Sequence, residues 1–371
     1  MAMQIGLLIY GSPDTISGGY LYDRQLAQAL RRAGHGVEIV SLPWRNYGRH
    51  LADNFSPALL ARLRHGAFDL LLQDELNHPS LAWLNGRLRR EVTYPLVTIV
   101  HHLRSSERHP RLLLPLYRWV EERYLNSVDG LIFNSQTTRA SVMALLRTPK
   151  PHLVAYPAAD HRNPPATAEV VAAIRQRTFA TGPLQLLFVG NVIPRKGLHT
   201  LLQALAETPR PLWHLHVAGN LATDRAYVAQ VRRLIDAAVL NEHVTLYGVC
   251  TDEAIRALYW RCHLYAAPAY EGFGISYLEA MSFGLPVIAS TAGAAHEIVT
   301  PGVDGYLVAP DDTATLAARI TTLCRDRGLL AALACAARQR YDRHPTWQAS
   351  FAPALEWLGA LGASRATTLS L

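Results

Sequence analysis

The alternation of strand-like and helix-like segments constrains the fold of this chain more than any other feature of its sequence. Short apolar runs alternate with amphipathic helical runs almost throughout, which is the pattern of parallel sheets covered by helices. In the first half, strands are predicted at residues 4–10, 37–42, 69–73, 96–101, 130–134 and 153–156. In the second half, they are predicted at residues 184–189, 213–218, 244–247, 264–267, 287–289 and 305–308. We therefore predict an α/β protein with two doubly wound, Rossmann-like domains.

Length and helix-breaking residues suggest where the domains meet. At 371 residues the chain is long for one core and comfortable for two. Pro and Gly frame residues 158–183, which predicts a linker around a short helical patch. The predicted domains are residues 1–165 and 166–345. In the last segment, residues 346–371, an amphipathic helix carries Trp347, Phe351, Leu355 and Leu358 on one face, and residues from 362 onward are expected to be frayed.

Composition excludes several classes of protein. No apolar run approaches the ~18 residues of a membrane span, and residues 3–10 have the character of a first strand rather than a signal peptide. The four cysteines form no Cys-x-x-Cys pair, which argues against both a zinc site and a disulfide framework and favours a cytoplasmic location.

The positive charge is concentrated in the first half of the chain. Residues 1–160 hold 18 basic and 13 acidic side chains, within a net charge of +7 for the whole chain. A basic first half suits an anionic partner: nucleic acid, an anionic membrane surface or a phosphorylated acceptor. The sequence contains no helix-turn-helix, zinc or aromatic single-strand signature, so we expect no nucleic-acid partner.

Residues 264–281 combine a buried strand, an open turn and the start of a helix. Gly272 and Gly274 leave the backbone of the turn accessible, and Ser276 is predicted to cap the helix that follows. A helix start with free amides binds anions, phosphate above all. Glu271 and Glu279 flank this position as acceptors for sugar hydroxyls. The alternative is that both glutamates are only favourable partners of the helix dipole.

A second loop, residues 190–197, also ends a strand and opens a helix. It carries adjacent cations, Arg195 and Lys196, which are placed to hold a diphosphate. Only two of the chain's 36 basic residues are lysines, Lys150 and Lys196, which suggests that a compact ammonium is required here. The alternative is a solvated basic loop.

Together these residues resemble a known family. Glu271-x7-Glu279 with Gly272-Phe273-Gly274 inside it, followed by an Ala-Met-Ser-Phe-Gly-Leu-Pro run, resembles the signature of retaining glycosyltransferases of family 4. The resemblance implies a GT-B fold, in which two Rossmann-like domains face each other across a cleft and the last helix crosses back to the first domain. It also implies that the first domain binds the acceptor and the second binds a nucleotide-sugar donor. Transfer would proceed with retention, without a metal or other cofactor.

The resemblance also implies roles for individual residues. His101 ends a strand as in the family's Thr-x-His-Asp segment and would lie beside the transferred sugar, with Lys196 and Glu271 as the other catalytic residues. The implied donor-binding residues are Gly18, Gly19, Asn191, Arg195, Lys196, Glu271, Gly272, Phe273, Gly274, Ile275 and Glu279. Asn191 stands where the family has an arginine, and Arg195 is the candidate to compensate. Because adjacent residues of a strand face opposite ways, His101 and His102 are not expected to chelate one metal.

The acceptor and two other functions stay open at this point. Residues 104–123 mix arginines with leucines and aromatics, which is typical either of a helix lying on an anionic membrane or of a surface helix packed on the sheet. On the first interpretation the protein is peripheral at the inner face of the membrane and the acceptor is lipid-linked; otherwise it is another glycan or a small molecule. The Asn191 substitution also allows a catalytically silent partner subunit that binds nucleotide-sugar. A sugar-nucleotide epimerase on the same architecture is the third option.

Overall fold

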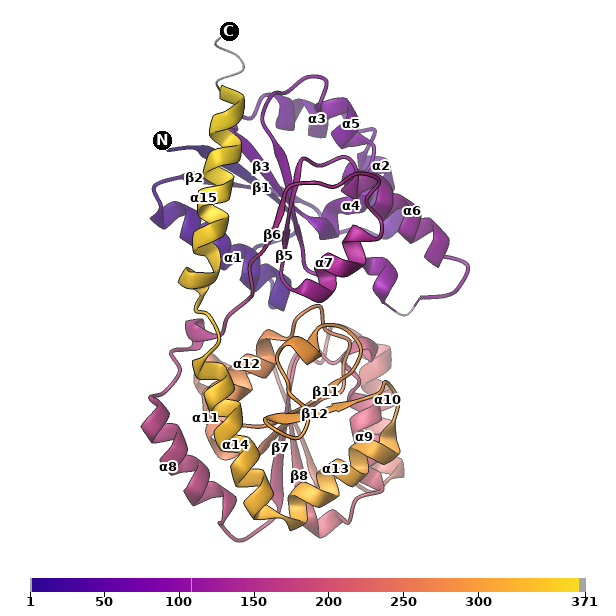
Figure 1. Cartoon of the computed structure of the whole chain (residues 1–371). Coiled ribbons are helices and arrows are strands. Elements are labelled where there is room, and N and C mark those ends of the chain that lie inside the picture. The colour runs from indigo at the N-terminus through magenta and orange to yellow at the C-terminus, as the bar shows by residue number, and fades with distance from the viewer. Residues whose placement is uncertain (1, 108, 367–371) are drawn as a thin grey trace. The chain divides into compact units, whose positions relative to one another are not determined.

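The computed structural model describes residues 2–107 and 109–366 and divides into two compact units (Figure 1). Unit 1 contains the chain up to Pro157 and again from Pro345 onward, and unit 2 contains Ala158–His344. The boundary therefore lies between Pro157 and Ala158, whereas the sequence analysis placed it after residue 165. Each unit is a parallel sheet covered by helices, which confirms the prediction of an α/β protein with two Rossmann-like domains.

Unit 1 is built on a six-stranded parallel sheet in the order β2-β1-β3-β4-β5-β6. Its strands are β1 (Gln4–Tyr10), β2 (Gly36–Leu42), β3 (Leu70–Asp74), β4 (Leu96–Val100), β5 (Gly130–Phe133) and β6 (His152–Val154). Strands β3, β4 and β5 are buried along their whole length, as expected of a parallel sheet with helices on both faces. The helices are α1 (Gly18–Arg32), α2 (Tyr47–Asp53), α3 (Pro57–Arg64), α4 (His78–Leu81), α5 (Leu84–Leu88), α6 (Leu114–Leu125), α7 (Gln136–Met143) and α15 (Trp347–Ala366).

Unit 2 repeats this architecture with the strand order β12-β11-β10-β7-β8-β9. Its strands are β7 (Leu184–Val189), β8 (Trp213–Ala218), β9 (Val244–Gly248), β10 (Leu264–Ala267), β11 (Val287–Ser290) and β12 (Gly305–Val308). Its helices are α8 (Thr167–Thr178), α9 (Leu198–Ala206), α10 (Arg225–Ala237), α11 (Asp252–Arg261), α12 (Ile275–Ser282), α13 (Thr313–Arg325) and α14 (Arg327–Asp342). The strand order reverses at β7, between β8 and β10, and ligands of open α/β sheets bind at the carboxyl end of such a switch point.

The segment predicted as a linker, residues 158–183, belongs to unit 2 instead. The helical patch predicted inside it is helix α8, whose side chains Val170 and Ile174 are fully buried against Ala334 of α14. These two residues are four positions apart and form an apolar face that unit 2 takes into its core. Gly284 is needed for this packing, since a Cβ there would lie 2.6 Å from the Ile174 side chain.

The last helix, α15, returns to unit 1, as predicted. Helix α15 lies beside α1 (Figure 1). Trp347 and Phe351 are buried and both contact Tyr22 of α1 edge-on, with ring centroids 5.7 and 5.1 Å away. Leu358 is buried as well, while Leu355 is half-buried. The helix continues to Ala366, so residues 362–366 are not frayed, and the predicted tail at 367–371 lies outside the described residues.

No helix in the described ranges combines the length and the apolar character that crossing a membrane requires.

Replacing Phe351 with alanine is expected to destabilise unit 1. The ring is 1% exposed, and removing a buried Phe side chain typically costs roughly 3–5 kcal/mol of unfolding free energy. Urea unfolding followed by tryptophan fluorescence measures the change. Phe55→Ala is the matched control, because Phe55 belongs to the same unit and is 71% exposed. Equal effects of the two substitutions would contradict the packing of α15 described here.

Candidate functional site

The predicted site in unit 2 begins where β10 ends. The turn after it closes at Gly274, whose φ of +108° lies in the left-handed region that favours glycine. A Cβ at this position would clash with the ring of Tyr277. Gly274 is itself the N-cap of α12, so the predicted cap at Ser276 is wrong: Ser276 already lies in the first turn of the helix. The turn therefore presents backbone rather than a capping side chain at the start of α12.

Glu271 is held from both its backbone and its side chain. Its carbonyl accepts a hydrogen bond of 2.9 Å from the amide of Ala294 and lies so close to Gly293 that a Cβ there would clash with it. Its carboxylate forms an ion pair with the ammonium of Lys196. Both side chains are largely enclosed, at 13% and 19% exposure, so the pair is only partly screened by water. The structure thus brings together Lys196 and Glu271, two predicted site residues that lie 75 positions apart in the sequence.

The loop with Lys196 packs directly on the turn with Glu271. Gly197 has a left-handed φ of +69°, and a Cβ there would lie 2.6 Å from the carbonyl oxygen of Pro268. Arg195 donates a hydrogen bond of 3.1 Å to the carbonyl of Tyr270. Arg195, the candidate to compensate for the arginine that Asn191 replaces, therefore contacts the same turn. Asn191 lies in this loop as well and accepts a hydrogen bond of 2.9 Å at its carbonyl from Ile193.

The residues between the two glutamates differ in what they expose. Gly272 and Ile275 are half-buried, whereas the side chain of Phe273 is 3% exposed and its ring lies 5.8 Å from that of His344. Phe273 is therefore a packing residue that fixes the turn. This refines the sequence analysis, which treated residues 272–275 alike.

Glu279 is buried at 5% exposure and surrounded by donors. Its Oε1 accepts a hydrogen bond of 3.0 Å from Nε of Arg162 and lies 3.0 Å from Nε2 of His161. Its Oε2 accepts a hydrogen bond of 2.9 Å from the hydroxyl of Tyr259. Burial alone would raise the pKa of Glu279, but His161 and Arg162 outweigh burial and hold that pKa below its usual range. Glu279 is therefore a buried carboxylate that is surrounded by hydrogen-bond donors and positive charge.

The sequence analysis missed these partners of Glu279. Arg162 precedes Glu279 by 117 positions and fell within the segment interpreted as a linker, and Tyr259 was not named in the sequence analysis. No spacing rule connects residues so far apart. Asp160–Arg162 form a single 3-10 turn, so periodicity carried no signal either.

In unit 1, the glycine loop and the strand-end histidine meet. A Cβ on Gly19 would lie 3.1 Å from the imidazole of His101, so the loop approaches the ring with no side chain between them. Nε2 of His101 lies 3.1 Å from Oδ1 of Asp23, whereas Nε2 of His102 lies 2.8 Å from Oε1 of Glu107. The two histidines therefore have different partners, and both follow β4, which ends at Val100.

The acidic groups around His101 set its charge. Burial alone lowers the pKa of this imidazole, but the carboxylates of Asp23, Asp74 and Glu75 outweigh burial and raise it to about 9. His101 is therefore a cation at neutral pH. Asp23, Asp74 and Glu75 were not named in the sequence analysis, although Asp74 ends β3, the neighbour of β4, and Glu75 follows it.

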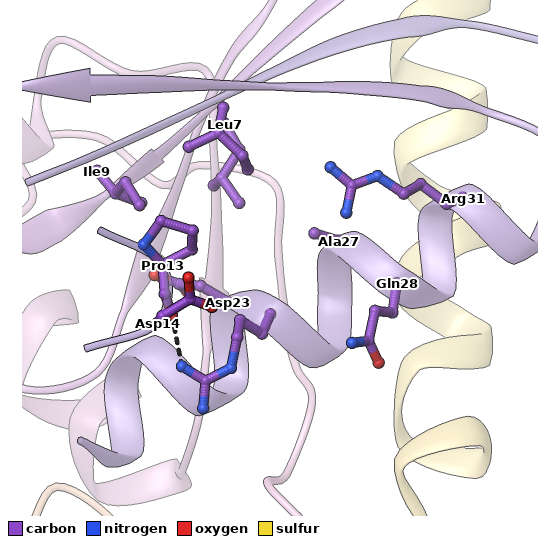
Figure 2. A pocket seen from close by; sticks show the side chains of 10 residues that line it. Leu7, Ile9, Pro13, Asp14, Asp23, Ala27, Gln28 and Arg31 are labelled. Atoms are coloured by element: carbon purple, nitrogen blue, oxygen red, sulfur yellow. Dashed lines mark hydrogen bonds between the residues drawn. The ribbon is translucent and has the colours of Figure 1, made fainter. Parts of the chain in front are cut away.

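Asp23 also borders the cavity shown in Figure 2. Oδ2 of Asp23 is buried and has no hydrogen-bond partner within residues 2–107 and 109–366. Asp23 and Ala27 of α1 face Leu7 and Ile9 of β1 across a space of about 220 Å³. The full lining is Leu7, Ile9, Pro13, Asp14, Asp23, Arg24, Ala27, Gln28, Arg31 and Ile39. This cavity lies between α1 and the sheet, and five of its ten lining residues are charged or polar.

Two groups of side chains in unit 1 have ligand atoms close enough for a cation. In each group these atoms lie within 4.8 Å of one another, and the groups are Asp23, Asp74 and His101, and Glu75, His78 and Glu121. In the second group His78 uses both ring nitrogens, at 3.1 Å from the carbonyl of Glu75 and 3.2 Å from the hydroxyl of Tyr47. Burial raises the pKa of Glu75 and of Glu121 to about 7. Oε1 of Glu75 is buried, lies 3.0 Å from Nδ1 of His78 and accepts no hydrogen bond within residues 2–107 and 109–366.

Two known proteins illustrate what the sequence of this chain is similar to. A phosphatidyl-myo-inositol mannosyltransferase from Mycobacterium leprae is 28% identical, over 92% of this chain and 93% of its own. An alpha-D-kanosaminyltransferase from Streptomyces kanamyceticus is 25% identical over a shorter region, 64% of each chain, so this chain spans less than two thirds of that relative.

Solved structures show the same fold. Sucrose-phosphate synthase from Thermosynechococcus elongatus has a TM-score of 0.81 at 23% identity and covers 97% of this chain and 99% of its own. HepE from Anabaena in complex with UDP-glucose has a TM-score of 0.74 at 23% identity and covers 99% of both chains.

Family matches cover almost all of both units. Residues 18–163 match the family described as Glycosyltransferase Family 4, and residues 171–340 match Glycosyl transferases group 1. The second match contains the Lys196 loop, the Glu271 turn and Glu279. The chain therefore belongs to the family 4-like glycosyltransferases of the GT-B fold.

Proposed function

We propose that this glycosyltransferase takes a sugar from a nucleoside-diphosphate donor and transfers it, with retention and without a metal, to an acceptor hydroxyl. The observation that carries the proposal is the meeting of Lys196 and Glu271 at the start of α12, on the switch-point edge of the sheet in unit 2. HepE, which has this fold, was solved with UDP-glucose, and the Mycobacterium leprae relative is named a mannosyltransferase.

The ion pair between Lys196 and Glu271 suggests how the donor enters. Without donor, each side chain neutralises the other. A diphosphate carries more negative charge than one carboxylate and attracts the ammonium of Lys196, with Arg195 and the amides at the start of α12 as further anion contacts. Glu271 is then released to accept hydrogen bonds from sugar hydroxyls, beside the backbone of Gly272 and Gly274. Glu279 accepts hydrogen bonds from the hydroxyls of the donor ribose.

The proposed reaction breaks the bond between the anomeric carbon and the diphosphate oxygen. The acceptor hydroxyl attacks the anomeric carbon on the same face, and its proton passes to the departing phosphate oxygen. Lys196 and the helix start stabilise the negative charge that develops on the leaving diphosphate. Since the phosphate takes the proton, neither Glu271 nor Glu279 acts as a nucleophile, in contrast to the carboxylate pair of a retaining glycosidase.

Replacing Lys196 with alanine is expected to abolish donor binding. Donor at ~100 times its Kd stabilises a folded protein by roughly 2.7 kcal/mol, so the wild type should show a clear thermal shift with one class of UDP-, GDP-, ADP- or dTDP-sugar. The variant should lose that shift, and its kcat/KM should fall by about 10²–10³, the effect of removing one preorganised donor of charge stabilisation. EDTA should change neither.

The other lysine provides the matched control. Lys150 lies in unit 1, where its ammonium donates a hydrogen bond of 3.0 Å to the carbonyl of Asn126, so Lys150→Ala should keep the donor shift. A wild type that responds to no donor at millimolar concentration would contradict the proposal. Binding without transfer would favour the silent partner, and release of free epimerised nucleotide-sugar would favour the epimerase.

His101 is proposed to contribute to transfer from unit 1 as a protonated imidazole, with Gly18 and Gly19 leaving the backbone beside it open. Because the pKa of His101 is about 9, the wild-type kcat/KM should fall as the pH rises through about 9. Asp23→Asn removes the nearest negative charge, so the midpoint of this fall should move to lower pH by at least about one unit. The pH profiles of both proteins, with His101→Gln as the variant that lacks the titration, measure the effect. An unchanged midpoint in Asp23→Asn would exclude this role.

We further propose that unit 1 lies on an anionic membrane and that the acceptor is lipid-linked. The supporting feature is the apolar surface of residues 112–119, which contains Leu112, Leu113, Leu114, Leu116 and Trp119, with Leu112 93% exposed. Helix α6 packs on unit 1 through Tyr117, Val120 and Tyr124, which leaves Leu116 and Trp119 on its exposed face. Arg111, Arg118 and Arg123 are exposed on the same segment, and Arg108, which belongs to the predicted basic stretch, lies outside the described residues. Exposed leucines beside arginines are typical of an interfacial segment.

Vesicle flotation tests the membrane proposal. The wild type should float with vesicles rich in phosphatidylglycerol more than with pure phosphatidylcholine, and added salt should weaken the binding. The double variant Leu112→Ser, Leu116→Ser should lose most of it. Its control, Phe179→Ser with Val249→Ser, removes two side chains of unit 2 that are each 62% exposed and should bind like the wild type. Equal binding to both vesicle types would contradict the proposal.

A further inference from the structure

The surroundings of Glu279 contain more charge and more hydrogen-bond donors than a buried structural carboxylate needs. One oxygen is bound by the guanidinium of Arg162 and the other by the hydroxyl of Tyr259, at 3.0 and 2.9 Å. A carboxylate offers about four acceptor positions, and Arg162, His161 and Tyr259 occupy three, so Glu279 keeps the capacity to accept a further hydrogen bond. Tyr259 is fixed in turn, since its ring is buried and stacks on Phe283 with centroids 5.2 Å apart.

Arg162 is held in place by contacts that do not involve Glu279. Its guanidinium also pairs with Asp252 at the start of α11. Its carbonyl and that of Asn163 accept hydrogen bonds of 3.2 and 2.7 Å from Arg256. Asn163 has a left-handed φ of 48°, a conformation that a side-chain-bearing residue adopts only when its surroundings enforce it. The first turn of unit 2 is therefore pinned to α11 and aims Arg162 at Glu279.

We infer that Arg162 is a positioning residue of the donor site, which keeps Glu279 ionised and in one orientation so that its carboxylate accepts the two adjacent hydroxyls of the donor ribose. The inference rests on the proposed function, since it concerns the same donor. A guanidinium suits this role because it stays charged at every physiological pH and directs its N–H groups in a fixed plane. Tyr259 orients the other oxygen, Oε2, through its hydroxyl. His161 lies beside Arg162 as a second partner of Oε1.

The chemistry separates this role from mere stabilisation of the fold. Without Arg162, burial would favour the protonated form of Glu279, because desolvation is the largest influence on it and acts to raise its pKa. A protonated carboxyl offers fewer acceptor positions to a diol. Loss of Arg162 should therefore affect recognition of the ribose hydroxyls specifically, and more at acidic than at basic pH. The other ionisable groups facing Glu279 are His161, Tyr259 and Tyr265.

The test compares UDP, GDP and ADP with their 2′,3′-dideoxy analogues by isothermal titration on the full chain. For the base that it binds, the wild type should have a Kd for the ribose nucleotide at least about tenfold lower than for the dideoxy analogue, and Glu279→Gln should lose that preference. In Arg162→Gln the ratio of the two Kd values should fall to near one at pH 6 and recover in part at pH 8.5. Arg162→Lys, which keeps the charge, should retain most of it and shows that the site folds.

Arg256→Gln is the matched control, because Arg256 pins the same turn without contacting Glu279. It should lower the preference for ribose less than Arg162→Gln does and by the same factor at both pH values, because Arg162 keeps its charge. If Arg256→Gln and Arg162→Gln behave alike, or if Arg162→Gln keeps the wild-type preference, the inference is overturned while the donor site stands. If the wild type binds none of the nucleotides, the proposed function fails first and the inference fails with it.

Discussion

The parallel pairing of β7 with β10 decides where the chemistry of unit 2 gathers. These strands lie side by side, with Leu186 opposite Leu264, although 78 residues and two further strands separate them along the chain. Their carboxyl ends therefore release two loops at the same edge of the sheet, one with Lys196 and one with Glu271. The loops touch only because Gly197 has no side chain: its Cα lies against the carbonyl of Pro268. A left-handed glycine thus sets the distance at which a cation and a carboxylate can neutralise each other.

The two units handle buried charge differently. In unit 2 the two carboxylates of the predicted site each have a cation beside them, Lys196 for Glu271 and Arg162 for Glu279, so these charges exist in pairs before any ligand arrives. Unit 1 instead crowds several carboxylates around few bases, which raises the pKa of Asp74 to about 8 and of Glu75 to about 7 by burial and mutual repulsion. The first arrangement is prepared for a fixed anionic ligand, while the second holds protons that it can exchange near neutral pH.

Periodicity and local motifs revealed the fold, because they act over short distances. The strands were found as apolar runs bounded by breakers, and the Glu271 turn by its glycines, since the backbone itself demands those residues. The linker was misplaced because Pro and Gly around residues 158–183 signal turns but not what the helix between them packs on. The partners of Glu279 were out of reach for another reason: Arg162 and Tyr259 have no pattern of their own and become neighbours only through the packing of α11 against the first turn of unit 2. Likewise, Asp23 joins His101 only because α1 crosses the end of β4.

The return of α15 to unit 1 has a consequence for the order in which the protein is made. Unit 1 starts the chain, yet Trp347 and Phe351, which cover Tyr22, leave the ribosome only after all of unit 2. Throughout that interval the apolar face of α1 beneath α15 has no cover, while unit 2 possesses every segment of its own sheet. Unit 2 can thus complete its fold first, although it comes second in sequence, and the domain translated first is the last to close.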